Sequence, residues 1–151
     1  VAREVGGPRG LLQARPLRWS TQAALERSGQ RLQGPCDAQE QFMLVAVLDV
    51  LAGNGQRTAE SILRDAADGL LLGVGFEEAF GRRVALPAYL REAAPAPGEE
   101  LRRRLAALDE ATLAKVLGPL LDERARQAIL ARRDLLLRSQ QRTAGQVPDA
   151  A

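Results

Sequence analysis

Asp49 is the charged residue that most invites a chemical role, because it alone interrupts the apolar run of residues 42–52. A carboxylate among such residues needs a partner, or loss of solvent raises its pKa. Three interpretations follow: an arginine salt bridge, which we expect, a functional acid, or exposure on a narrow polar edge. Arg132 is the second candidate for a buried charge, because it falls within the main apolar stripe of the last predicted helix. We expect its aliphatic stem to be buried and its guanidinium to reach solvent; the alternatives are a pair with a carboxylate or an opening at this position.

The composition removes most other catalytic chemistry. The chain has no His, a single Lys (Lys115) and a single Cys (Cys36). Ser-His-Asp and Cys-His catalysis, imidazole zinc sites and intramolecular disulfides are therefore excluded, and the lone Cys fits a reducing compartment. Adjacent acids on a helix point about 100° apart, so the acidic pairs of this chain make no ready metal site. We predict no enzyme, no cofactor and no metal; an enzyme using a carboxylate as acid or base is the third hypothesis.

Basic residues form the next group with a possible function. Arg102, Arg103 and Arg104 are consecutive, and Trp19 lies in a basic segment. Arginines neutralise phosphates and an aromatic ring can stack on a base, so these four residues are the candidate nucleic-acid contacts. Other aromatic residues are scarce, and nearby acids dilute most arginine clusters. Nucleic-acid binding is therefore the second hypothesis.

A partner-binding surface is predicted on the last helix, at about residues 119–141. At 100° per residue its main apolar stripe includes Ala125, Ile129 and Leu136, whereas Leu130 and Leu137 fall on nearly the opposite face. A helix with two apolar stripes is sandwiched in a core or carries a surface for another chain. We take the second interpretation as the leading one. The predicted partner-binding residues are Leu130, Leu137, Arg126 and Arg133.

The elements that would position these residues are predicted to be helices. Asp37 is a suitable N-cap for a buried central helix at about 38–53, which would end at Gly53. Apolar residues recur at helical spacing over 58–72, which predicts a second long helix. Shorter helices are predicted at about 21–32, 76–83 and 87–93.

Two leucine-rich segments in the C-terminal third begin alike, with Leu108-Asp109-Glu110 and Leu121-Asp122-Glu123. Each Asp is a suitable helix N-cap, and each Glu suits the first turn. The pattern is similar to helical pairs in the superhelical domains of magnesium transporters and flagellar motor-switch proteins. It consists of leucines and caps, so the resemblance implies helices and transfers no functional residue.

Together these patterns predict an all-α fold, a compact bundle of six or seven helices. The expected organisation is a flexible arm (1–18), a single helical domain (19–142) with a possible corner at 95–98, and a disordered tail (143–151). Net charge runs from +4 over 1–36 to −6 over 37–101 and +4 over 102–151.

The leading hypothesis is a non-enzymatic adaptor, regulatory or assembly subunit that binds a protein partner or a second copy. No apolar run is long enough to span a membrane. We expect a cytoplasmic location, or an organelle matrix if the acid-poor residues 9–21 are the remnant of a presequence.

Overall fold

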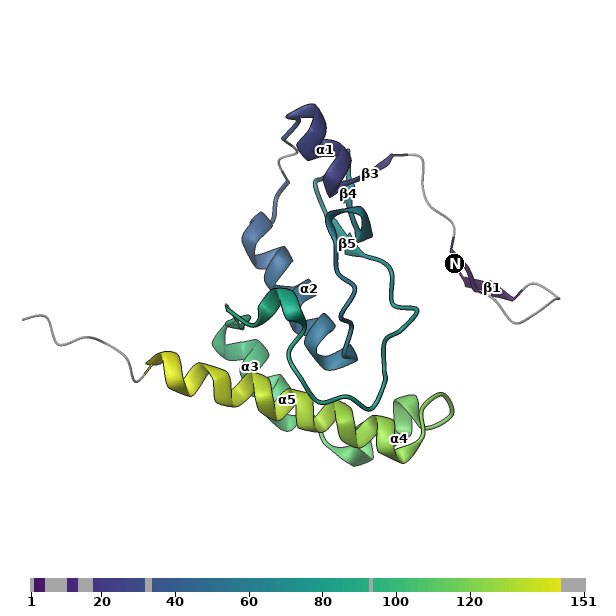
Figure 1. Ribbon diagram of the computed structural model, residues 1–151, viewed down its shortest axis with the longest axis vertical. Helices are drawn as coiled ribbons and strands as arrows, with labels where there is room; N and C mark the ends of the chain where they lie inside the picture. Colours follow the sequence, from purple (N-terminus) through teal and green to yellow (C-terminus); the bar gives the residue numbers. More distant parts are fainter. Residues whose placement is uncertain (1, 5–10, 14–17, 32–33, 93, 145–151) are drawn as a thin grey trace, which may run out of the picture.

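The computed structural model describes residues 2–4, 11–13, 18–31, 34–92 and 94–144, with side chains from Arg18 to Arg138 within those ranges. This part of the chain forms five α-helices, two short 3-10 helices and two small antiparallel sheets (Figure 1). The predicted all-α bundle of six or seven helices is therefore wrong: the structure is a mixed α and β fold. The predicted arm contains paired strands, β1 (Ala2–Glu4) and β2 (Leu11–Gln13), and the rest of residues 1–17 lies outside the described residues.

Helix α2 (Ala38–Ala52) lies at the centre of the fold, between α5 and the larger sheet. The Asp37 carboxylate caps it by accepting hydrogen bonds from the backbone N–H groups of Gln39 and Glu40, at 2.7 and 3.0 Å. Gly53 ends it with φ of 69°, a left-handed conformation that glycine adopts without strain. The helix was predicted to be buried, but Leu44 and Leu48 are exposed on one of its faces.

The larger sheet contains β3 (Trp19–Thr21), β4 (Ile62–Asp65) and β5 (Leu71–Gly73), with β4 in the middle. The short helix α1 (Gln22–Ser28) follows β3 directly, and the 3-10 helix η1 (Ala59–Ser61) precedes β4. The predicted helix over 58–72 is therefore wrong. A turn at Asp68 and Gly69, where Gly69 has φ of 66°, reverses the chain and allows β4 and β5 to pair.

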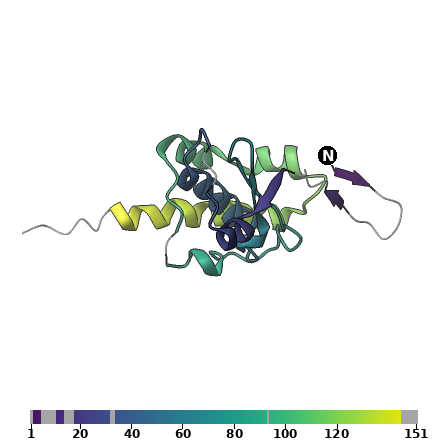
Figure 2. The same cartoon turned by 90° about the horizontal axis from the view of Figure 1, so that it is seen from above.

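Three helices form the C-terminal half: α3 (Glu99–Ala107), α4 (Glu110–Leu117) and α5 (Glu123–Ala144). Asp109 caps α4 by accepting a hydrogen bond from the Thr112 N–H at 2.8 Å. Asp122 accepts one from the Ala125 N–H at 2.8 Å, at the start of α5. Helix α5 packs against α2, α3 and α4, and its last turns extend past the other elements in two perpendicular views (Figures 1 and 2). Of the predicted tail, Thr143 and Ala144 belong to α5, and residues 145–151 lie outside the described part.

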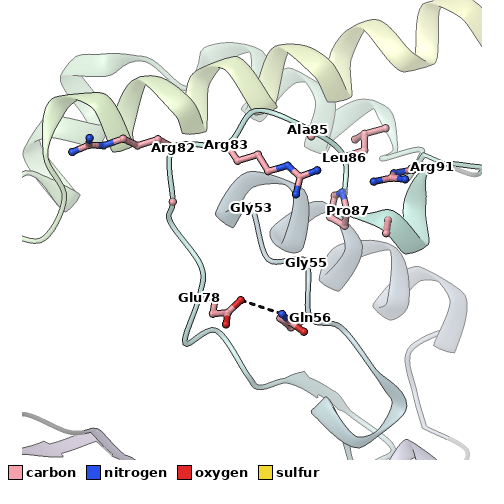
Figure 3. Close-up of a pocket in the computed structure, with 12 residues that line it drawn as sticks. Gly53, Gly55, Gln56, Glu78, Arg82, Arg83, Ala85, Leu86, Pro87 and Arg91 are labelled. Carbon is pink, nitrogen blue, oxygen red and sulfur yellow. Dashed lines mark hydrogen bonds between the residues drawn. The ribbon is translucent and has the colours of Figure 1, made fainter.

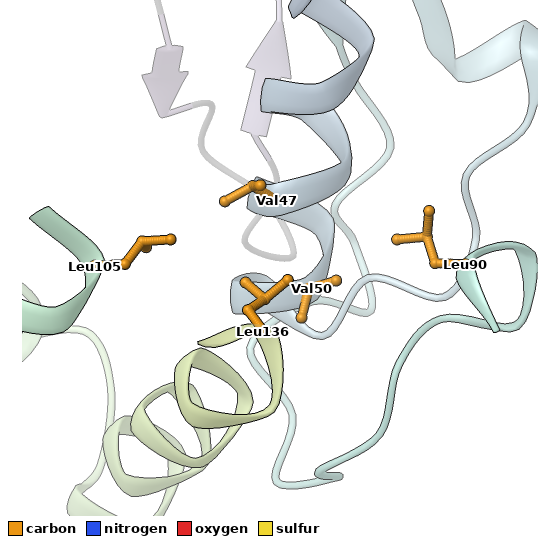
Figure 4. Packing of buried hydrophobic residues seen from close by; sticks show 5 residues of the cluster. All are labelled: Val47, Val50, Leu90, Leu105 and Leu136. Carbon is orange, nitrogen blue, oxygen red and sulfur yellow. The ribbon is translucent and has the colours of Figure 1, made fainter. Parts of the chain in front are cut away.

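The main hydrophobic core joins α2, α3, α5 and the 3-10 helix η2 (Ala88–Leu90). Figure 4 shows Leu136 of α5 directed toward Val50 of α2, and both side chains are fully buried. The other members of this cluster are Val47, Leu90 and Leu105. The predicted helix at 76–83 is absent from the structure, and only η2 occupies the region predicted as a helix at 87–93. The described residues between β5 and α3, 74–92 and 94–98, are therefore largely irregular, apart from η2.

Candidate functional site

The irregular segment 74–98 is the most distinctive part of the fold, because long connections without regular structure are uncommon inside compact domains and often carry function. It runs from the end of β5 to the start of α3. Two arginines from elsewhere in the chain donate hydrogen bonds to its backbone carbonyls: Arg57 to Val74, and Arg132 to Gly81 and Arg83. These two arginines hold the segment against the C-terminal end of α2.

Asp49 is the acceptor on which the first arginine depends. It is fully buried in the last turns of α2. Arg57 binds it with two hydrogen bonds, from Nη2 to Oδ1 at 2.6 Å and from Nε to Oδ2 at 2.8 Å. Asn54 Nδ2 donates to Oδ1 at 2.9 Å, and the Tyr89 hydroxyl donates to Oδ2 at 2.6 Å. Four donors therefore occupy the acceptor positions of this carboxylate.

Arg57 connects that carboxylate to the 3-10 helix η1 and to the segment 74–98. Its side chain is only 4% exposed. Its Nη1 donates to the backbone carbonyl and the hydroxyl of Ser61, at 2.7 and 3.2 Å, in addition to Val74. The guanidinium also lies over the Phe76 ring, 5.0 Å from the ring centroid, where the negative face of the ring favours a cation.

Burial and Asp49 together set the proton affinity of Arg57 and Tyr89. Burial by itself would lower the pKa of Arg57, but the hydrogen bond and negative charge of Asp49 outweigh it and raise this pKa. Burial, reinforced by Asp49, also raises the pKa of the Tyr89 phenol above its ordinary value of 10.0, against the opposing charge of Arg57. Asp49 thus holds a charged arginine and a protonated tyrosine, and it has no acceptor position left for a substrate. This arrangement is the salt bridge to an arginine that we expected for Asp49 from the sequence.

Arg132 of α5 is also fully buried, but its surroundings differ. Its Nε donates to the Leu51 carbonyl at 2.9 Å, and its Nη1 donates to the Gly81 and Arg83 carbonyls, both at 2.8 Å. Its Nη2 is buried without a hydrogen-bond partner in the described part of the chain. Burial lowers the pKa of this guanidinium, and no carboxylate compensates for it there. Contrary to the expectation from the sequence, the Arg132 guanidinium does not reach solvent, and within the described residues it pairs with no carboxylate.

A pocket of about 360 Å³ lies beside Arg132, between the loop after α2 and the segment 81–91. Figure 3 shows Arg83 and Arg91 at one end of it, on either side of Pro87, with Glu78 and Gln56 hydrogen-bonded to each other at the other end. Arg82 lines it too, but its guanidinium is bound to Asp122 at 2.6 Å. Pro87 and two further apolar residues, Ala85 and Leu86, complete this part of the wall.

A second and more open cavity, of about 860 Å³, lies between the N-terminal halves of α2 and α3. We call it the α2–α3 groove. Met43, Leu44 and Leu101 give it an apolar lining, and 56% of Leu44 is exposed. The charged residues of its border are four acids and one arginine: Asp37, Glu40, Glu99, Glu100 and Arg104.

The predicted partner-binding residues of α5 are mostly engaged within the chain. Leu137 is half-buried and packs against the main core, and Leu130 is half-buried as well. Arg126 binds Glu110 at 2.8 Å and also donates to the Leu121 carbonyl. Arg133 pairs with Asp134 at 2.7 Å and donates to the Leu108 carbonyl. These four residues therefore leave little free surface for a partner.

The predicted nucleic-acid contacts lie on separate elements. Arg102, Arg103 and Arg104 are exposed on α3, and Glu100 of the same helix binds both Arg103 and Arg104. Trp19 is half-buried in β3, where it pairs across the sheet with Asp65. No interaction of the described residues brings Trp19 together with the arginines of α3.

Sequence reasoning missed Arg57, Tyr89 and Arg91 as site residues. Arg57 could have been suspected, because it follows Asp49 closely across a Gly-Asn-Gly turn. Tyr89 is forty positions from Asp49, and no local pattern indicates that contact. Arg91 stands out only when the segment 81–91 is folded over the end of α2.

Comparisons with protein families, curated proteins and solved structures give no match to this chain. No helix within the described residues is both long and apolar enough to cross a membrane. Over the same part of the chain, no three metal-binding side chains of the His, Cys, Asp and Glu types gather at one point.

Proposed function

We propose that the protein is a non-enzymatic interaction module that binds a basic, amphipathic helix of a protein partner in the α2–α3 groove. The observation that carries this proposal is the exposed apolar face of α2 beside an acidic border. Leu44 and Leu48 are 56% and 47% exposed, although they belong to the central helix of the fold. Residues four positions apart lie on the same face of a helix, so these two leucines form one strip.

The shape of the groove favours a helix as its occupant. Met43, Leu44 and Leu101 line a concave surface between two helices, and Leu48 extends the strip by one turn of α2. Grooves of this kind accept the apolar face of an amphipathic helix, whose side chains recur every three or four residues. Burying one leucine of such a contact stabilises it by roughly 1.5–3 kcal/mol.

The charge of the border favours a basic partner. Among the four acids, Glu100 is bound by Arg103 and Arg104, and Asp37 caps α2. Glu40 and Glu99 form no ion pair within the described residues, so their charges are available to a partner's Lys or Arg. Opposite charge around an apolar contact increases the rate of association and selects among partners.

The alternatives have weaker support. Glu100 neutralises part of the arginine cluster on α3, which reduces its attraction for phosphates. Asp49 is saturated by hydrogen bonds, so it is not free to serve as the acid or base of the carboxylate-enzyme hypothesis. The proposal therefore replaces the predicted contact surface on α5 with the groove between α2 and α3.

Fluorescence anisotropy with a synthetic peptide tests this function. The peptide is a labelled amphipathic helix with leucines on one face and lysines along the edges of that face. We expect Leu44→Glu to weaken its binding by about tenfold or more, since the substitution removes an apolar contact and adds a like-signed charge to the border. Val116→Glu is the matched control, because Val116 is even more exposed, at 64%, and lies on α4.

The control variant should bind the peptide as the wild type does. Equal weakening by both substitutions would mean that general charge, and not the groove, governs binding. Absence of saturable peptide binding to the wild type would also contradict the proposal. So would self-association of the wild type, seen by sedimentation and abolished by Leu44→Glu, because the groove would then bind a second copy of the chain.

A further inference from the structure

The pocket beside Arg132 contains two arginine side chains that the fold does not use. Arg82 is paired with Asp122, but Arg83 and Arg91 form no ion pair or side-chain hydrogen bond within the described residues. Both lie at the same end of the pocket (Figure 3). Their structural roles are in the backbone: the Arg83 carbonyl accepts a hydrogen bond from Arg132, and the Arg91 N–H donates to the Ala88 carbonyl. The two guanidinium groups are therefore available to a ligand.

Arg132 adds a third positive charge directly behind the pocket wall. Gly53 lines the pocket, and a Cβ atom at this glycine would lie only 2.9 Å from Arg132 Nη1. Arg132 also binds the Leu51 carbonyl, in the last turn of α2. It thus neutralises the partial negative charge that a helix C-terminus would otherwise place at this wall. Because no carboxylate compensates for Arg132 there, its field adds to that of the two arginines in the pocket.

The remaining walls limit the size and polarity of a ligand. A volume of about 360 Å³ is near the lower end for small-molecule sites. Leu86 and Pro87 give an apolar wall next to the arginines. Glu78, hydrogen-bonded to Gln56 at 3.0 Å, places carboxylate oxygens at the opposite end, where a hydroxyl or amino group could donate to them. The arrangement is that of a site with an anion-binding end and an acceptor end.

We infer that this pocket binds a small phosphomonoester, with its phosphate between Arg83 and Arg91. A phosphate has more acceptor oxygens and more negative charge than a carboxylate, so it is suited to two guanidinium groups that approach from different directions. The buried charge of Arg132 strengthens the site and holds its wall in place through Gly81 and Arg83. This site is separate from the α2–α3 groove, and no residue lines both.

Isothermal titration with inorganic phosphate tests the inference, at constant ionic strength maintained with sodium chloride. The wild type should bind phosphate saturably. The double variant Arg83→Gln, Arg91→Gln should bind it at least about tenfold more weakly, because two charge-assisted contacts are lost. Both side chains are exposed, and the backbone acceptor at residue 83 is retained, so this variant should unfold at the temperature of the wild type.

A matched double variant, Arg102→Gln and Arg124→Gln, removes the same net charge from exposed positions outside the pocket. Its affinity for phosphate should equal that of the wild type. Equal weakening in both double variants would overturn the inference, because it would show only a general effect of charge. Absence of saturable phosphate binding, or acetate binding as tight as that of phosphate, would overturn it too.

Discussion

Two buried arginines hold the same irregular segment, but they do so with different electrostatics. Arg57 has a carboxylate partner in Asp49, so its charge is compensated where solvent is absent. Arg132 has three backbone carbonyls and no carboxylate within the described residues. Removing one member of a buried ion pair costs roughly 3–5 kcal/mol, because the other charge is left uncompensated. Loss of either Asp49 or Arg57 should therefore be strongly destabilising. Arg132, in contrast, retains a net positive charge beside the pocket.

Tyr89 provides a direct measurement of the Asp49 cluster, since it is the only tyrosine in the chain. Although 44% of the residue is exposed, partial burial and the hydrogen bond to Asp49 raise the pKa of Tyr89 above 10.0 in the folded protein. The folded protein then retains a proton that the unfolded chain releases at about pH 10. The stability that protonated Tyr89 contributes is complete below that pH and is lost as the pH rises through the folded pKa. Ultraviolet absorbance of the phenolate should therefore appear at higher pH in the native protein than in urea.

The Asp49→Asn variant distinguishes the cause of this shift. It removes the negative charge that opposes a phenolate, so the phenol should titrate closer to 10.0 if the variant is folded at that pH. Tyr89→Phe should lose the absorbance change altogether. A native titration that coincides with that of the unfolded chain would show that the hydrogen bond between Tyr89 and Asp49 does not form.

At the scale of elements, the C-terminal end of α2 is where the helix, the segment 74–98 and α5 meet. Gly53 turns the chain out of α2 in a left-handed conformation and leaves space for the Arg132 guanidinium. Phe80, a non-glycine residue with φ of 63°, donates its backbone N–H to the Ala52 carbonyl. A bulky residue in this conformation is strained, by about 1–3 kcal/mol, so surrounding contacts must maintain it.

The comparison of Gly53→Ala with Gly29→Ala separates backbone strain from the contact with Arg132. Both glycines follow a helix and have nearly equal φ values, 69° and 67°. A Cβ at Gly29 meets nothing within 4 Å, so this substitution should cost only backbone strain, about 1 kcal/mol. Gly53→Ala should cost at least about 1 kcal/mol more in urea denaturation, because it displaces a buried guanidinium. Equal losses would indicate that Arg132 does not pack against Gly53.

The helices with local start and stop signals were predictable, and the sheet was not. Asp37, Asp109 and Asp122 cap α2, α4 and α5 as their positions suggested. Residues 58–72 match helical spacing, and all residues of β4 are buried, so the alternation that marks a half-exposed strand is absent. The turn between Asp65 and Leu70, in which Asp68 Oδ1 accepts a hydrogen bond from the Leu70 N–H, outweighs that spacing.

At the scale of the whole molecule, α2 supplies both the core and the exposed groove. Its apolar residues lie on every face because α5 packs on one side and β5 on another, and the Leu44–Leu48 strip is left over. The sequence indicated a central apolar helix but could not indicate which of its faces remains open. That depends on where α3 and the segment 74–98 lie. Distant contacts of Arg57, Tyr89 and Arg132 position the segment, and packing against α5 positions α3.

Binding of a basic amphipathic helix in the α2–α3 groove can be observed residue by residue. The experiment is a titration of the isotopically labelled protein with the leucine-lysine peptide, followed by backbone amide NMR. We expect the shifted amide signals to concentrate in the first half of α2 and in α3, around Leu44 and Leu101. Shifts confined to α5 around Leu130 and Arg133, or no shifts at all, would contradict it.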